Sequence, residues 1–390
     1  MIAIELIFWC SVILLFHSYI FYPLLLQLFS RNRSQNKVTY DLNEELPDVS
    51  ILLAVYNEEE VIEKKIISTF NTSYPIDKIE FLIGSDQSTD RSEEIILKYS
   101  ERFPKLKLIR FYQRSGKVNI MNRLAELSRG QILLLTDANV FFSETVIYEL
   151  VKHFKQQPVA LVGANILNPN LKTDGISFQE SSYLFMENHI KYLEGILWGG
   201  MMGAFGGCYA IRKDYFIPVP DKFIVDDFYI TMSVLEQRGK ALAELNAVCY
   251  EDVSNRIAEE FRRKSRIATG NFQIIGRFNK LLSPSKGGIA FAFWSHKVLR
   301  WMGPFFIIGA YLSNFALSFS NTFYNLCFWI QCILLLIPIL DSVLRKLKVH
   351  FFGLRYITHF YVMNLALLNG FFKFIGGVKN NVWTPTQRNQ

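Results

Sequence analysis

The chain has 390 residues, half of them hydrophobic and a fifth charged, with a net charge of +7. Its apolar residues gather at the two ends and leave a middle of soluble composition, which argues against a purely soluble globule. No interleaved basic and aromatic surface suggests nucleic acid, so the basic excess is assigned to flanks that contact anionic lipid. The five cysteines are scattered without a C-x-x-C and the six histidines show no metal spacing, so neither disulfides nor zinc is predicted.

The first predicted element is an apolar run from Ile2 to Phe29, whose only charge is Glu5. At 1.5 Å per helical residue, this run exceeds the hydrocarbon core of a bilayer, about 30 Å. We therefore expect a transmembrane helix over residues 1–30. A cleaved signal peptide is the less favoured alternative, because a basic n-region and a small-residue cleavage site are missing.

A soluble domain is expected over residues 47–255, with alternating strands and helices. Continuous apolar runs are typical of parallel strands buried on both faces, whereas apolar residues spaced three and four apart indicate helices. The expected strands are 49–55, 79–83, 106–111 and 132–135, and the expected helices are about 61–70, 90–99 and 117–127. This order predicts an open, doubly wound α/β sheet.

Polar and acidic residues follow three of these strands, at the edge where such sheets bind ligands. They are Tyr56, Asn57 and Glu58, then the segment from Ser85 to Asp90, then Asp137 and Asn139. Each has a structural alternative, since Asp90 can cap a helix and Ser88 and Thr89 can form a turn. Their recurrence at three strand ends favours a binding site.

The segment Asp137-Ala138-Asn139 offers hard oxygen ligands that suit Mg²⁺ or Mn²⁺ bridging a diphosphate. In an extended chain, side chains two positions apart point the same way, so both oxygens are expected to reach one cation. No Walker-type phosphate loop and no strand-linked G-x-G-x-x-G is present, which argues against a nucleoside triphosphatase or a dinucleotide enzyme.

Residues 256–296 form an amphipathic, basic stretch that is expected to be helical. Arg262, Arg263, Lys264 and Arg266 alternate there with apolar residues such as Ile257, Phe261 and Ile267. A basic amphipathic helix typically lies on anionic lipid, so membrane lipid is an expected partner. One of these arginines can still bind a diphosphate, because a guanidinium pairs with two phosphate oxygens at once.

About three transmembrane helices are expected over residues 297–379, at 299–318, 323–340 and 356–377, followed by a tail at 380–390. Arg31, Arg33 and Lys37 place the soluble domain in the cytosol and the N-terminus outside by the positive-inside rule. The segment at 356–377 conflicts with the positive-inside rule, because three further crossings after the first helix would place Lys373 and later basic residues outside. Because Asn364 and Asn369 make this segment less apolar, the alternative to a simple crossing is a re-entrant or tightly packed segment.

Several motifs in series resemble the membrane-bound, inverting family 2 glycosyltransferases with a GT-A fold. They are Val-Tyr-Asn-Glu-Glu at 55–59, Ser-Asp-Gln-Ser-Thr-Asp at 85–90, Gly-Lys-x-Asn-x-x-Asn at 116–122, Thr-Asp-Ala-Asn at 136–139, Gly-Gly-Cys-Tyr-Ala-Ile-Arg at 206–212 and Val-Asp-Asp-Phe at 225–228. The segments 262–267 and 295–301 are similar to membrane-bound members, and the likeness runs from about residue 2 to 388. It implies an α/β GT-A domain with α-helical transmembrane segments.

The resemblance implies roles for individual residues in transfer from a nucleotide sugar, a UDP-sugar by family habit. Asp86 would meet the nucleobase, with Tyr56 and Glu58 near the nucleoside and Lys117 near the donor. Asp137, helped by Asn139, would hold the metal, and Asp227, beside Asp226, would be the general base. Arg263 and Arg266 would contact the diphosphate, and Gly207 and Cys208 would lie on the acceptor side, Cys208 as a small buried residue. Helix capping is the structural alternative for Asp226 and Asp227.

Two departures from the family pattern bear on the function. Asn139 stands where the family usually has the second Asp of Asp-x-Asp, so the metal site has one charge fewer. Of the family's Gln-x-x-Arg-Trp, only Arg266 remains, with Ile267 in place of the Trp that stacks on the acceptor sugar in processive synthases. Limited addition of sugars is therefore at least as well supported as polymer synthesis.

The predicted activity is thus inverting, metal-dependent hexosyl transfer at the cytosolic face of a membrane, commonly the bacterial inner membrane. The acceptor would be a saccharide or a lipid-linked molecule, in surface polysaccharide or glycolipid synthesis, and a polyprenyl phosphate is an acceptor variant. The alternative from another class is a non-catalytic membrane scaffold that binds nucleotide sugar or a synthase subunit.

Overall fold

A computed structural model describes the chain except for residues 35, 170, 172–174, 253, 348 and 379–390. The chain forms two compact units. The sheet unit comprises residues 29–170 and 183–253, and the helical unit comprises residues 1–28, 171–182 and 254–377. The sheet unit covers most of the soluble domain expected at 47–255, but residues 171–182 and 254–255 of that range belong to the helical unit.

The sheet unit is built on one eight-stranded sheet in the order β3-β2-β1-β4-β7-β6-β8-β5. Its strands are β1 (Val49–Val55), β2 (Ile79–Asp86), β3 (Leu106–Phe111), β4 (Ile132–Thr136), β5 (Phe141–Phe142), β6 (Val159–Leu167), β7 (Cys208–Arg212) and β8 (Lys240–Tyr250). The first four are parallel, as expected. Beyond them β7 runs antiparallel to both β4 and β6, so the complete sheet is mixed and not doubly wound throughout.

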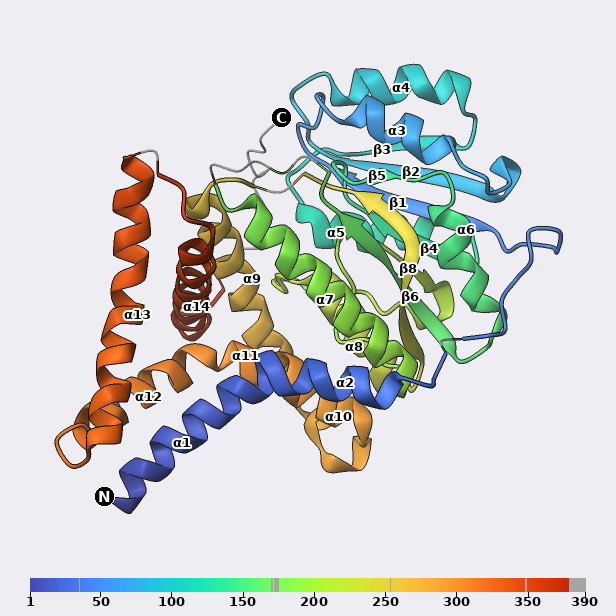
Figure 1. The fold of residues 1–390 in the computed structure, drawn as a ribbon. Coiled ribbons are helices and arrows are strands. Elements are labelled where there is room, and N and C mark those ends of the chain that lie inside the picture. The colour runs from blue at the N-terminus through green and yellow to red at the C-terminus, as the bar shows by residue number, and fades with distance from the viewer. Residues whose placement is uncertain (35, 170, 172–174, 253, 348, 379–390) are drawn as a thin grey trace. The chain divides into compact units, whose positions relative to one another are not determined.

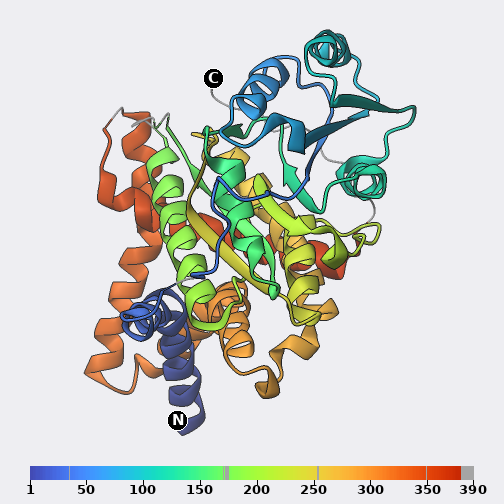
Figure 2. The same ribbon diagram turned by 90° about the vertical axis from the view of Figure 1, so that its right-hand side faces the viewer.

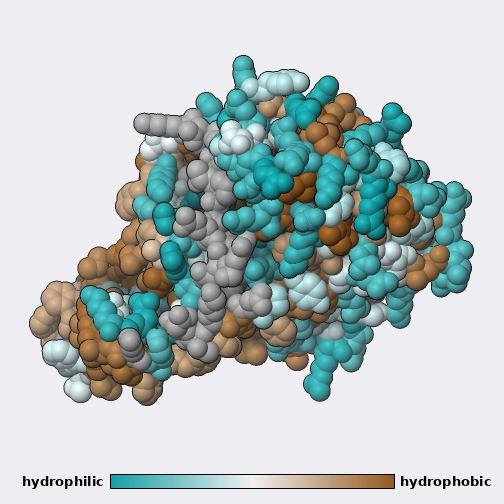
Figure 3. All heavy atoms as spheres, turned by 90° about the horizontal axis from the view of Figure 1, so that it is seen from above, coloured by the Kyte–Doolittle hydropathy of each residue, from teal (hydrophilic) through white to brown (hydrophobic). Residues whose placement is uncertain are grey.

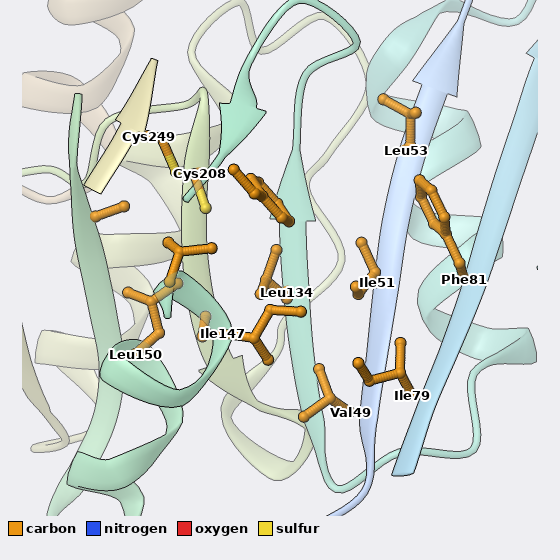
Figure 4. Close-up of a cluster of buried hydrophobic side chains, with 14 of the residues drawn as sticks. Val49, Ile51, Leu53, Ile79, Phe81, Leu134, Ile147, Leu150, Cys208 and Cys249 are labelled. Atoms are coloured by element: carbon orange, nitrogen blue, oxygen red, sulfur yellow. The ribbon is translucent and has the colours of Figure 1, made fainter. Parts of the chain in front are cut away.

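One face of this sheet is covered by α3 (Ile62–Phe70), α4 (Ser92–Arg102) and α6 (Val146–Val151), as Figures 1 and 2 show. Alternate residues of the strands, among them Ile51, Phe81 and Leu134, are buried against these helices. Figure 4 shows this layer continuing to Ile147 and Leu150 of α6. Each such side chain contributes about 1.5–3 kcal/mol by leaving water, so the layer fixes the strand ends rigidly.

The opposite face is covered in part by α5 (Gly116–Leu127), whose Ile120 and Leu124 lie directly over Gly84 of β2. A Cβ at position 84 would come within 2.3 Å of Ile120, so the glycine permits this close approach. The unit also holds α8 (Asp226–Glu236) and most of α7 (Ser177–Trp198). The strands and helices expected between residues 49 and 136 are thereby confirmed, with boundaries shifted by a few residues.

One local expectation is wrong. Strand β4 ends at Thr136, and the next four residues form a turn closed by the Val140 N–H, which donates to the Asp137 carbonyl at 3.3 Å. Asp137 and Asn139 therefore do not lie in an extended strand, in which their side chains would point the same way. The chain reverses here to enter β5, and any convergence of their oxygens depends on the turn and on its neighbours.

A continuous helix runs from Ile2 to Ser30 and is made of α1 (Ile2–Phe16), the π-helical turn His17–Phe21 and α2 (Tyr22–Ser30). The helical unit contains this helix up to residue 28. It continues after residue 254 with α9 (Ile257–Arg277), α10 (Gly288–Ala292), α11 (Leu299–Trp301), α12 (Gly303–Leu317), α13 (Thr322–Lys346) and α14 (Phe352–Ile375). The helix expected in the amphipathic stretch is confirmed as α9.

Two helices among the described residues are long and apolar enough to cross a membrane, Ile2–Ser30 and Thr322–Lys346. Helix α12 is apolar but has 15 residues, about 22 Å, which is short for a bilayer core of about 30 Å. Large side chains of α13 stay exposed, including Leu326 at 60%, Ile333 at 60% and Ile339 at 63%. Figure 3 shows hydrophobic residues gathered at its left-hand end, where Figure 1 draws α13.

The last apolar segment, α14, packs closely on the amphipathic helix α9. The Asn369 amide donates to Ser265 Oγ at 2.8 Å, and Thr269 Oγ1 donates to the Gly370 carbonyl at 3.3 Å. A Cβ at position 370 would lie 2.4 Å from the Cβ of Ala268, so the helices meet at a small-residue contact. Of the alternatives left open for this segment, tight packing is the one that the contacts support.

Candidate active site

Asp86, at the end of β2, anchors the start of α5. Its carboxylate is fully buried and accepts hydrogen bonds from Ser115 N at 2.6 Å and Gly116 N at 3.2 Å. Arg114 Nε also donates to it at 3.1 Å. Because these groups precede Lys117 directly, Asp86 determines where the first turn of α5 presents that lysine.

Arg114 lies between Asp86 and Tyr56, two residues expected at the nucleoside. Its guanidinium carbon lies 3.4 Å from the centre of the Tyr56 ring, a stacked cation–π contact. The aromatic ring and the planar cation make a flat surface beside the buried carboxylate. A nucleobase can stack on such a surface and find hydrogen-bond donors at its edge.

The loops after β1 and β2 are held together by their own polar groups. Asn57 adopts a positive φ of 53°, and its side-chain oxygen accepts from Thr89 N at 2.8 Å. The backbone N–H of Glu58 donates to Ser92 Oγ at 2.9 Å, and Asp90 accepts from Ser92 N at 3.0 Å. The N-cap of α4 is Arg91, so Asp90 is not the capping residue; its two oxygens instead accept from Ser92 N and Glu59 N and tie the two loops together.

Lys117 joins two of the predicted acidic residues. Its Nζ lies 2.8 Å from Asp137 Oδ1 and 3.6 Å from Asp226 Oδ2. Burial lowers the pKa of this lysine, but the charges of Asp137 and Asp226 outweigh burial, so the pKa is raised above its ordinary value. The end of β4, the start of α5 and the start of α8 thus meet around one fixed positive charge.

Asp227 lies next to this cluster and has a raised pKa. Burial and the neighbouring Asp226 charge raise its pKa to about 6, although Lys117 opposes the shift. Its Oδ1 accepts from Phe228 N at 2.7 Å, whereas the N-cap of α8 is Val225, so neither Asp226 nor Asp227 caps the helix. A Cβ at position 206 would lie 2.8 Å from Asp227 Oδ2, so a side chain at this position would collide with the carboxylate.

Lys65 holds the turn that carries Asp137 through two hydrogen bonds. It is fully buried in α3, and its Nζ donates to Thr136 Oγ1 at 2.8 Å and to the Val140 carbonyl at 2.6 Å. Thr136 Oγ1 in turn donates to the Gly207 carbonyl at 2.9 Å. Burial lowers the pKa of Lys65 to about 8. This network fixes both ends of the 137–140 turn and the backbone of Gly207.

Asn139 is almost fully buried, and its amide nitrogen donates to Glu251 Oε1 at 2.8 Å. Glu251 immediately follows β8, and its side chain is partly buried. No sequence pattern links these residues, which are separated by 112 positions. The pair places one further carboxylate beside the turn.

The oxygen donors of Asp137 and Asn139 fit a hard divalent cation. No group of three or more His, Cys, Asp and Glu side chains in the described part of the chain is arranged to hold a metal. Mg²⁺ and Mn²⁺ do not require one, because they commonly take one or two carboxylates and complete their coordination with water and substrate phosphate. Asp137 already pairs with a cation, the Lys117 ammonium, so this position favours positive charge.

The remaining predicted residues lie elsewhere. Cys208 is fully buried in the core beside Cys249, as Figure 4 shows, so its side chain serves packing. Arg263 and Arg266 belong to α9 of the helical unit. Arg263 pairs there with Glu180 at 2.9 Å and Glu260 at 2.8 Å, whereas Arg266 is exposed. Their contact with a diphosphate remains a prediction.

Sequence reasoning missed Lys65, Arg114 and Glu251. Lys65 had a usable signal, since a charged residue occupies the stripe of α3 that otherwise holds buried Ile62, Ile66 and Phe70. Arg114 lies two residues before the Gly116-Lys117 motif and could have been included with it. Glu251 had no local signal, because only the fold brings it to Asn139.

The chain resembles known proteins in sequence and in fold. Residues 50–218 match the family described as Glycosyl transferase family 2. A beta-monoglucosyldiacylglycerol synthase of Nostoc sp. is 30% identical over 63% of this chain and 53% of its own length. A poly-beta-1,6-N-acetyl-D-glucosamine synthase of Staphylococcus aureus is 22% identical over 67% of this chain and 66% of its own. The chain thus spans between half and two thirds of these relatives.

A solved structure has the same fold. The mannosyltransferase PcManGT from Pyrobaculum calidifontis, in complex with GDP-Man and Mn²⁺, aligns with a TM-score of 0.68 at 18% identity. The alignment covers 95% of this chain and 99% of that one. The expectation of a GT-A-like α/β fold is confirmed.

Proposed function

We propose, from the glycosyl transferase family 2 domain that this chain carries at residues 50–218, that the protein transfers a sugar from a nucleotide sugar to a saccharide or lipid-linked acceptor. The transfer is a single in-line displacement that inverts the anomeric carbon. UDP-sugars are the first donor candidates. GDP-mannose is the second, because the structural neighbour was solved with it.

The observation that carries this proposal is the paired environment of Asp227 and Lys117. Asp227, with a pKa near 6, is ionised at neutral pH yet close enough to neutrality to accept a proton in the transition state. As the acceptor oxygen forms its bond to the anomeric carbon, its proton passes to Asp227. The bond from that carbon to the diphosphate breaks, and the leaving group keeps the electron pair. Lys117 places a permanent positive charge beside the site, which favours the departing anion.

The donor is held by residues with distinct tasks. Tyr56 and Arg114 offer the stacking surface for the base, and Asp86 holds the loop that carries Arg114. Asp137 and Asn139 would hold a Mg²⁺ or Mn²⁺ ion, which when bound would neutralise charge on the diphosphate. A Cβ at Gly206 would crowd Asp227 and one at Gly207 would crowd Val140 of the 137–140 turn, and these glycines are proposed to lie on the acceptor side. Arg263 and Arg266 are proposed to contact the diphosphate.

The apolar helices are proposed to anchor the chain in a membrane, with the sheet unit in the cytosol of a bacterial cell. The support is the length and composition of Ile2–Ser30 and Thr322–Lys346 and the exposed apolar side chains of α13. Alkaline carbonate washing of membranes is then expected to leave the chain in the pellet. Its release into the supernatant would contradict the anchoring.

The activity is tested with the purified chain, Mn²⁺, lipid extract and a panel of UDP- and GDP-sugars. Release of the free nucleotide identifies the donor, and mass analysis of the product distinguishes one added sugar from a polymer. The anomeric configuration of the product, read by NMR, must be opposite to that of the donor. Binding of nucleotide without release from any donor would instead support the non-catalytic scaffold.

A further inference from the structure

Asn139 and Glu251 form a side-chain pair beside the 137–140 turn. Asn139 Nδ2 donates to Glu251 Oε1 at 2.8 Å, and only 5% of Asn139 is exposed. The backbone of Glu251 is fixed as well, because its N–H donates to the Leu167 carbonyl at 3.0 Å and its carbonyl accepts from Asn168 Nδ2 at 2.8 Å. Neither partner is thus a loosely placed surface group.

Strand pairing brings the two residues together. The short strand β5 runs antiparallel to the end of β8, with Phe141 opposite Tyr250 and Phe142 opposite Cys249. Continuing that register by one position places Val140 opposite Glu251. Asn139, one residue further on, is the nearest polar side chain of the turn. The pairing therefore holds the carboxylate at a constant distance from the amide.

A carboxylate imposes an orientation on the amide. An ionised Glu can only accept hydrogen bonds, so the donor end of the Asn139 amide must face it. The amide oxygen Oδ1 then points to the other side of the group, where it accepts no hydrogen bond within the described part of the chain. This oxygen is the atom that a hard cation binds, whereas the NH₂ group cannot be a ligand.

We propose that Glu251 is a positioning residue of the cation site: it holds the Asn139 amide with Oδ1 free for a divalent cation beside Asp137. The inference rests on the proposed function for the identity of the site. Glu251 also supplies the negative charge that an asparagine lacks, and the hydrogen bond transmits part of that charge to Oδ1.

The same pair accounts for an asparagine at position 139. An aspartate there would place two carboxylates within about 3 Å of each other, with no hydrogen-bond donor between them, and their charges would repel. With asparagine and glutamate, the pair carries one negative charge and a satisfied hydrogen bond. Glu251, which follows β8 and is 112 positions away in sequence, thereby adds a carboxylate to the Asp-x-Asn motif.

The test compares Glu251→Gln, Asn139→Asp and the double variant, with Glu101→Gln as the control because Glu101 is an exposed residue of α4. Mn²⁺ affinity is measured by electron paramagnetic resonance in the presence of UDP, together with UDP affinity without metal and the thermal unfolding midpoint. Glu251→Gln is expected to weaken Mn²⁺ binding about 10–100-fold, since a glutamine no longer dictates which end of the amide faces the site.

The double variant is expected to regain Mn²⁺ affinity to within a few fold of wild type, because the introduced glutamine donates to the introduced carboxylate. Unchanged Mn²⁺ affinity in Glu251→Gln with a lowered unfolding midpoint would overturn the proposal in favour of a purely structural pair. Tighter binding in Asn139→Asp alone than in the double variant would make Glu251 a direct ligand and also overturn it.

The proposal and the proposed function can fail separately. Sugar transfer by a wild-type chain that binds no Mn²⁺ would refute the role of Glu251 and leave the transferase intact. The expected Mn²⁺ pattern in a chain that turns over no donor would support Glu251 and refute the transferase.

Discussion

At the scale of residues, the site is organised by the positive charge of Lys117. Asp137 and Asp226 pair with this charge directly, and the pKa of the adjacent Asp227 is raised to about 6. Asp226 and Asp227 are adjacent in the chain but have different surroundings. Asp226 is held by the lysine, whereas burial and the charge of Asp226 raise the pKa of Asp227.

This electrostatic arrangement predicts the pH dependence of the reaction. Only the ionised form of Asp227 can accept the acceptor proton, and its folded-state pKa is raised from about 3.9 to about 6. We therefore expect kcat/KM to fall tenfold per pH unit below about 6 and to level off above it, because Lys117 stays protonated throughout that range. A pH–rate profile whose acid limb lies near 4 would contradict the assignment of Asp227.

Part of the charged centre was predictable because the sequence places polar residues at strand ends. This holds for Asp137, which follows a strand; Lys117, Asp226 and Asp227 were predicted as site residues only from the family resemblance, and the structure brings all four together. Glu251 was not predictable, because its contact with Asn139 depends on the pairing of β5 with β8 across more than a hundred residues. Local pattern carries no information on such a pairing.

At the scale of elements, the parallel strands followed directly from their apolar runs, since a strand buried on both faces needs apolar residues at every position. Strand β7 was not predicted, because it has only five residues and is held by pairing with β4 and β6, which are distant in sequence. The 137–140 segment was misjudged for a related reason. Its turn depends on Lys65 and Gly207, which hold Thr136 and Val140 from other elements.

The contact between α9 and α14 predicts a stability effect. Gly370→Val would drive a branched side chain into the Cβ of Ala268 and the carbonyl of Ser265, at 2.4 and 2.8 Å from the position of a Cβ. Overpacking of this kind costs about 1–3 kcal/mol, so the unfolding midpoint in detergent is expected to fall by several degrees.

Gly353→Ala is the matched control on the same helix, because nothing lies within 4 Å of a Cβ at that position. It is expected to leave the midpoint unchanged or to raise it, since alanine favours helix over glycine by about 1 kcal/mol. Equal effects of the two substitutions would show that the close contact of α14 with α9 does not stabilise the protein.

At the scale of the whole molecule, the chain combines a sheet unit that carries the proposed chemistry with a helical unit that carries the apolar surface. The proposed site residues Asp86, Lys117, Asp137 and Asp227 belong to the first, and the exposed apolar residues of α13 belong to the second. This division suits an enzyme whose donor is soluble and whose acceptor is attached to lipid.

The central claim is that this chain catalyses sugar transfer with Asp227 as its base. Its most direct test is the turnover of Asp227→Asn in membranes, beside Asp77→Asn, which alters an exposed aspartate before β2. We expect Asp227→Asn to lose about 10²–10⁴-fold in turnover while UDP affinity stays within a few fold, and Asp77→Asn to match wild type. Turnover of Asp227→Asn close to that of wild type would contradict the claim.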